Sequence, residues 1–119
     1  MIYNRTPHTV VLLGDRLAPL ATFPSLGEAR AVASRVLVDE IELDPAAPGA
    51  LPLAFVYQVA FGEVTDLPDP TPGDRHIVSR ITAEAARAQG RTTDDLLIPD
   101  DVVRGTDGQP LGCRAFSRL

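Results

Sequence analysis

Short apolar runs, separated by turn residues, open the chain and predict strands. Residues 8–13 (HTVVLL) are rich in β-branched and aliphatic side chains, and apolar residues resume over 16–23 (RLAPLATF). Gly14 and Asp15 lie between the two runs. Two runs of this kind on either side of a Gly-Asp pair predict a β-hairpin.

The segment 25–43 fits two periodicities. Val32 and Val36 recur at helical spacing, and the run from Ser25 to Glu28 has the form of a capping box. The same segment also alternates, most clearly over residues 40–43 (EIEL), in the way a strand does. The hydrophobic pattern therefore leaves helix and strand both open here.

Residues 44–52 (DPAAPGALP) hold three prolines and a glycine, which predicts a surface loop. The next segment, 53–64 (LAFVYQVAFGEV), is the most apolar of the chain and carries three of its six aromatic residues. It predicts a central strand with Gly62 as a bulge or a point of close approach. One face of that strand is expected to form core: Phe55, Tyr57, Val59 and Phe61.

A helix is expected in the second half of the chain. Residues 66–74 (DLPDPTPGD) are rich in turn formers, and Ile77 and Val78 continue a strand-like run. Residues 81–89 (ITAEAARAQ) are Ala-rich and stop at Gly90, a favoured residue just beyond helix ends. This pattern predicts one short helix.

A last hairpin is expected near the C-terminus. Residues 96–98 (LLI) are apolar, and Asp107-Gly108 separates Val102-Val103 from Leu111, with Phe116 further on. Asp-Gly between apolar runs is a strong hairpin signal. Together the elements predict an α+β fold that is mostly antiparallel β, built of hairpins in a small sheet or partly open barrel, with one short helix near 81–89.

Composition narrows the class of protein. The 119 residues suit a single domain, 1–119, with 16 acidic against 11 basic residues and a net charge of -5. This acidity argues against binding to nucleic acid. No apolar run is long enough to span a membrane, the N-terminal residues lack the apolar core of a signal peptide, and Cys113 is the single cysteine. We therefore expect a soluble, cytoplasmic protein.

Histidines and aspartates supply the candidate chemistry. His8 and His76 with a carboxylate could bind a transition metal, but their spacing matches no metal-site signature. The pairs Asp94-Asp95 and Asp100-Asp101 could hold Mg²⁺ or Ca²⁺, yet Asp also forms turns through its own side chain. We expect no bound metal and no cofactor.

Ser79 precedes the predicted helix, but the Gly-x-Ser-x-Gly pattern of a nucleophile elbow is absent, so we expect Ser79 to cap the helix. Arg80 and Arg104 flank the aspartates and could neutralise them or bind an anion. No residue is assigned as catalytic. The candidate ligand-binding residues are His8, Ser79, Arg80, Asp94, Asp95 and Arg104.

Several short motifs are spread over nearly the whole chain. They are residues 4–10 (NRTPHTV), 61–64 (FGEV), 76–79 (HIVS) and 112–114 (GCR). With these motifs the sequence resembles a family of small uncharacterised proteins found in bacteriophages, prophages and GC-rich bacteria. The resemblance implies an extended conformation near 23–38 in place of a helix, and it carries no catalytic assignment.

Two functions of different classes remain after these observations. The first is a non-enzymatic binding or interaction module for a protein partner or a small ligand. The edge strands of such a module could also contact a second copy, so a homo-oligomer is possible. The alternative is a small metal-dependent hydrolase or nucleotide-processing enzyme that uses His and Asp residues. A subunit with a purely structural role is a third interpretation.

Overall fold

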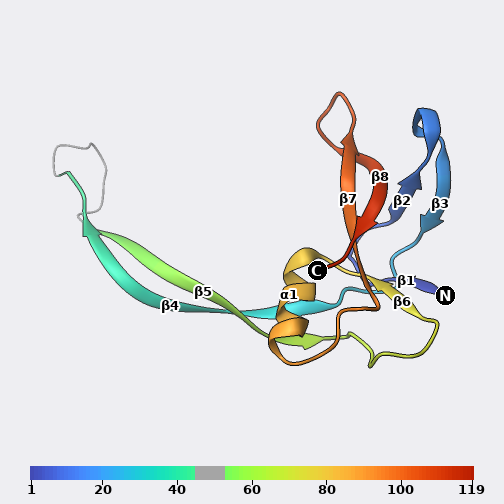
Figure 1. Ribbon diagram of the computed structural model, residues 1–119. Coiled ribbons are helices and arrows are strands. Elements are labelled where there is room, and N and C mark those ends of the chain that lie inside the picture. The colour runs from blue at the N-terminus through green and yellow to red at the C-terminus, as the bar shows by residue number, and fades with distance from the viewer. Residues whose placement is uncertain (45–52) are drawn as a thin grey trace.

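The computed structural model describes residues 1–44 and 53–119. The chain forms two parts (Figure 1), which we call the body, residues 1–29 and 66–119, and the arm, a long hairpin that projects from it. The predicted α+β, mostly β fold is confirmed. The predicted loop over 44–52 falls outside the described residues except for Asp44.

The body contains a six-stranded sheet in the order β1-β6-β7-β8-β2-β3. The elements of the body are β1 (Ile2–Asn4), β2 (Val10–Leu13), a 3-10 turn (Asp15–Leu17), β3 (Pro19–Phe23), β6 (Arg75–Ile77), α1 (Arg80–Ala88), β7 (Leu96–Arg104) and β8 (Pro110–Ser117). The pairs β2–β3 and β7–β8 are antiparallel, whereas β1–β6, β6–β7 and β2–β8 are parallel.

Both hairpins predicted in the body are present. The β2–β3 pair turns through a 3-10 turn in which Arg16 and Leu17 have positive φ. In the β7–β8 pair, Gly108 has φ +80 and donates its amide to the carbonyl oxygen of Gly105 over 3.0 Å. Glycine is favoured there because a side chain resists that backbone conformation.

The sheet nearly closes on itself through Asn4 at the end of β1. Asn4 is 1% exposed, and its Nδ2 donates to the carbonyl oxygens of His8 (2.7 Å) and Phe23 (2.8 Å). Its Oδ1 accepts from the amide and the hydroxyl of Thr6. Asn4 also pairs with Ser25 in an isolated parallel bridge. One side chain thus joins the first edge strand to the far end of the sheet.

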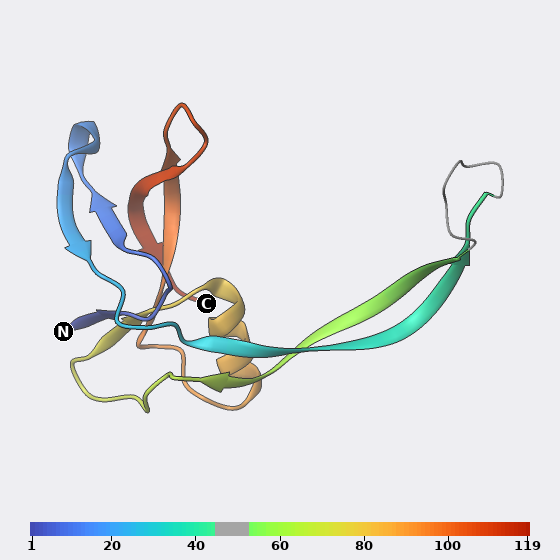
Figure 2. The same ribbon diagram turned by 180° about the vertical axis from the view of Figure 1, so that it is seen from behind.

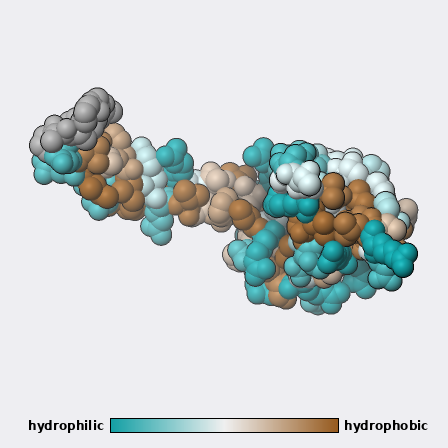
Figure 3. Space-filling view, turned by 90° about the horizontal axis from the view of Figure 1, so that it is seen from above, coloured by the Kyte–Doolittle hydropathy of each residue, from teal (hydrophilic) through white to brown (hydrophobic). Residues whose placement is uncertain are grey.

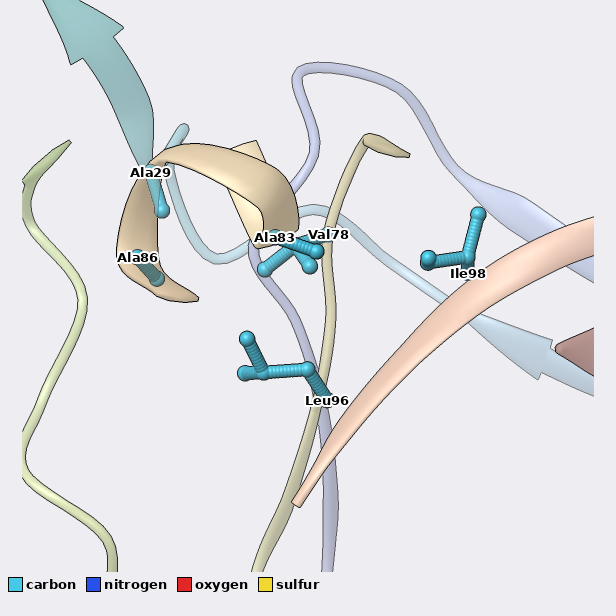
Figure 4. Packing of buried hydrophobic residues seen from close by; sticks show 6 residues of the cluster. All are labelled: Ala29, Val78, Ala83, Ala86, Leu96 and Ile98. Carbon is cyan, nitrogen blue, oxygen red and sulfur yellow. The ribbon is translucent and has the colours of Figure 1, made fainter. Parts of the chain in front are cut away.

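Helix α1 is fixed by local signals at both ends. The hydroxyl of Ser79 accepts from the amide of Thr82 at 3.2 Å, which confirms the predicted cap. Gly90 follows the helix with φ +84. Small side chains let α1 pack closely on the base of the arm, where the Thr82 hydroxyl donates to the carbonyl oxygen of Ala29. The buried cluster around α1 (Figure 4) consists of Ala29, Val78, Ala83, Ala86, Leu96 and Ile98.

The arm is an antiparallel pair of 13-residue strands, β4 (Arg30–Glu42) and β5 (Leu53–Thr65). The extended conformation expected near 23–38 is therefore confirmed for the part within β4. Figures 1 and 2 show this twisted ribbon reaching away from the body, with both chain termini left behind on the body. The radius of gyration is 19.0 Å, against about 13.5 Å for a compact chain of this length.

The prediction that residues 53–64 form a central core strand was wrong. In the described residues β5 pairs with β4 alone, in a two-stranded sheet separate from that of the body. Phe55 is 54% exposed and Phe61 is 45% exposed, and Tyr57 and Val59 are exposed as well. An apolar composition indicates that a segment packs against another surface. It does not show whether that surface belongs to the same chain or to a partner.

Candidate functional site

The structure does not bring the six candidate ligand residues to one place. His8 is exposed between β1 and β2, and its carbonyl oxygen accepts from Asn4 and Thr6. The run Asn4-Arg5-Thr6-Pro7-His8 therefore has a structural role, because it supplies the hydrogen bonds that close the sheet. Ser79 caps α1.

The two candidate arginines make local interactions. Arg80 Nε lies 3.2 Å from Glu84 Oε1, one turn along the helix, so the two side chains form an exposed ion pair. Arg104 donates to the carbonyl oxygen of Gly108 over 3.0 Å and stays exposed. Both side chains stabilise the elements they belong to.

Asp94 and Asp95 have different environments. Both oxygens of Asp95 accept from Arg91, each at 2.9 Å, and side-chain exposure is only 11% for Asp95 and 16% for Arg91. Asp94 is exposed and lines an open depression of about 370 Å³ with Arg75. Over residues 1–44 and 53–119, no three His, Cys, Asp or Glu side chains are grouped as metal ligands would be.

His76 and Cys113 are buried in the body. The ring of His76 stacks on Tyr3 at 5.6 Å, and its Nδ1 accepts from Arg5 Nε at 3.4 Å. Burial lowers the pKa of His76, the positive charge of Arg5 lowers it further, and the carboxylate of Asp95 opposes both. Burial also raises the pKa of the Cys113 thiol, so Cys113 packs as a small hydrophobic side chain.

The arm offers the most extensive exposed apolar surface. Because cross-strand partners share a face, the pairing register divides the side chains between two sides of the ribbon. We call one side the aromatic face, whose apolar residues are Leu37, Leu53, Phe55, Tyr57, Val59 and Phe61. All six are exposed, between 37% and 54%. Figure 3 shows hydrophobic residues standing along the arm among hydrophilic ones.

Two irregularities decide which side chains reach the aromatic face. Near the body, Val32 faces both Gly62 and Glu63, so the bulge predicted at Gly62 is confirmed. Further out, the pairs Leu37–Tyr57 and Asp39–Val56 leave Val38 as an extra residue in β4. The extra residue shifts the alternation that follows it.

The charges of the aromatic face follow from that shift. Glu40 pairs with Phe55 and Glu42 with Leu53, so both carboxylates lie on the aromatic face, near the distal end of the arm. Arg35 pairs with Val59, and its guanidinium carbon lies 4.0 Å from the centre of the Tyr57 ring, close enough for a cation–π contact. The apolar stripe is thus bordered by a cation on one side of Tyr57 and acids on the other.

Sequence reasoning predicted the strands of this surface but not its exposure. One signal was present, since two apolar segments flank the Pro-rich residues 44–52 and each is much longer than the usual five or six residues of a strand. Strands of that length extend past a small sheet. The shift at Val38 has no comparable signal in the sequence.

No family model, curated protein or solved structure matches this chain. Within the described residues no helix is long and apolar enough to cross a membrane.

Proposed function

We propose that this protein is a non-enzymatic interaction module that binds a protein chain through the aromatic face of its arm. The observation that supports this function is the exposure of six large apolar side chains on a ribbon that α1 contacts at its base and that pairs with no further strand in the described residues (Figure 1). An isolated two-stranded hairpin is marginally stable in water, and contiguous exposed apolar surface marks protein contacts.

A protein partner suits this surface better than a small ligand does. Small molecules bind in concave pockets, whereas the aromatic face lies along a projecting ribbon. Its edges also leave backbone donors and acceptors that a further strand can pair with. The proposal includes a role for the chain as one subunit of a protein assembly. The resemblance to phage and prophage proteins supports this part of the proposal.

The alternative, a metal-dependent hydrolase or nucleotide-processing enzyme, has no comparable observation behind it in residues 1–44 and 53–119. Asp95 pairs with Arg91, and His8 contributes hydrogen bonds through its carbonyl oxygen. His76 lies buried against Tyr3. These side chains stabilise the body.

Matched variants of the two arm faces test the function. Changing Phe55 and Phe61 to Thr keeps β propensity but removes the largest side chains of the aromatic face. We expect this variant to lose the complexes that the wild-type chain forms, with itself or with a protein from its own cells, while the melting temperature of the body is unchanged. Changing Val36 and Ile41, on the opposite face, to Thr is the control and should preserve binding.

Two results would contradict the function. One is an aromatic-face variant that forms every complex of the wild-type chain with the same affinity. The other is loss of those complexes in the opposite-face control alone, which would assign the binding surface to the other side of the ribbon.

A further inference from the structure

We infer that the partner covering the aromatic face is a second copy of this chain, packed arm against arm with a two-fold axis through the Leu37–Tyr57 pair. The inference rests on the proposed function and names its partner. In a two-fold interface the same patch meets itself, so each residue and its contact must be related by the axis. The aromatic face meets this condition in the apolar positions of β5 and in the charged pair Arg35 and Glu40 of β4.

The apolar residues of β5 are arranged symmetrically about Tyr57. A two-fold axis that passes between the two faces, across the strands, reverses the strand direction. It places Phe55 of one copy over Val59 of the other, and Leu53 over Phe61. A larger ring then meets a smaller side chain at each position away from the axis, and the two Tyr57 rings lie near the axis.

The charged residues of β4 follow the same symmetry. Arg35 pairs with Val59 and Glu40 with Phe55, so these two residues lie at equal register on opposite sides of Tyr57. The axis that joins Phe55 to Val59 therefore joins Glu40 of one copy to Arg35 of the other, twice per dimer. These opposite charges are complementary, which favours this register over a slipped one.

The bulge at Val38 creates this complementarity. In a regular ribbon, residues 37, 39 and 41 share one face of the strand. With the extra residue, Glu40 joins the aromatic face and Asp39 pairs with Val56 on the opposite face. The same axis would set Asp39 against Val36 there, an acid against an aliphatic side chain. In this register the opposite face brings no opposite charges together, whereas the aromatic face does so twice. The other acid of the aromatic face, Glu42, lies against Ala33 at the end of the overlap.

The buried area predicts a reversible dimer. Covering the six apolar side chains on both copies removes roughly 1,000 Å² from water, which is just below the range of stable, specific interfaces. The arms are the contact, so the bodies stay apart and each keeps its own core. We expect dissociation on dilution into the micromolar range, with weaker association at high salt because the charged pairs lie at the surface.

Charge reversal tests this arrangement, with mass in solution measured by sedimentation. The wild-type chain should reach twice its 12.7 kDa at high concentration. Arg35→Glu sets acid against acid and Glu40→Arg sets cation against cation, so each variant alone should bind itself at least tenfold more weakly. An equimolar mixture of the two should form a heterodimer, and the double variant R35E/E40R should regain the homodimer.

The mixture separates this contact from effects within one chain. Arg35→Glu also removes the stacking on Tyr57 of the same chain, and mixing cannot restore that stacking. Ile41→Arg, on the opposite face, is the control and should dimerise like the wild type. A wild-type chain that stays monomeric at all concentrations, or a mixture that does not associate, would overturn the inference. Binding of another protein through the aromatic face would still leave the proposed function intact.

Discussion

Asn4 donates from its Nδ2 atom to the carbonyl oxygen of Phe23 over 2.8 Å, and this hydrogen bond joins the first strand to the end of β3 across 19 residues of sequence. The same side chain also donates to the carbonyl oxygen of His8 and accepts from the amide and hydroxyl of Thr6. Its donors and its acceptor are therefore all used. A buried amide with every hydrogen bond formed is effective at fixing one arrangement of strands.

Changing Asn4 to Ala should lower the free energy of unfolding by about 2 to 4 kcal/mol, because the carbonyl oxygen of Phe23 loses the Asn4 donor and the amide of Thr6 loses its acceptor. Urea unfolding measures the effect. The matched variant Thr6→Val removes only one hydroxyl from the same cluster and should cost less. An Asn4→Ala protein with wild-type stability would show that the sheet does not depend on this closure.

Truncating a side chain in the arm and truncating one in the body should lower the free energy of unfolding by very different amounts. Phe61→Ala should cost about 1 kcal/mol or less in the free chain, because its side chain is 45% exposed. Leu96→Ala should cost about 2 to 5 kcal/mol, because Leu96 is 1% exposed within the cluster around α1. Urea unfolding at low protein concentration compares the two. A larger cost for Phe61→Ala than for Leu96→Ala would place Phe61 in the core after all.

The buried side chain of His76 should make the stability of the fold depend on pH. Its pKa in the folded chain lies below the ordinary value of 6.5, mainly through burial, so the unfolded chain binds more protons as the pH falls through that value. Stability should therefore fall as the pH is lowered from about 7.5 and level off below the folded-state pKa of His76.

A histidine variant separates this effect from other groups. His76→Gln removes the buried imidazole, so it should flatten the pH profile below about 7.5. Urea midpoints of the wild type and the variant across the pH range give the comparison. The prediction fails if His76→Gln retains the wild-type slope.

The sequence predicted those elements whose signals are local. Ser79 and Gly90 mark the ends of α1 through hydrogen bonds and backbone freedom within a few residues, and Gly108 marks the last hairpin in the same way. The fold class followed from these elements.

Features that depend on distant parts of the chain could not be predicted. The closure by Asn4 needs the carbonyl oxygen of Phe23, and the burial of His76 needs Tyr3. The exposure of the arm beyond its contact with α1 depends on where the rest of the chain packs, and no local sequence pattern shows this. The Arg91–Asp95 pair is four residues apart but lies outside the helix, so the spacing that indicates an ion pair on a helix does not apply to it.

Amide hydrogen exchange of the arm, with and without its partner, tests most directly whether the aromatic face is the binding surface. In dilute, uncomplexed chain the peptides within 30–44 and 53–65 should exchange rapidly, because a lone hairpin opens readily. In the complex, or in concentrated wild-type chain, the same peptides should exchange at least tenfold more slowly, with the body unchanged and no slowing in the variant with Phe55 and Phe61 changed to Thr. Unaltered exchange of the arm in a stable complex, with protection on the body instead, would contradict the account.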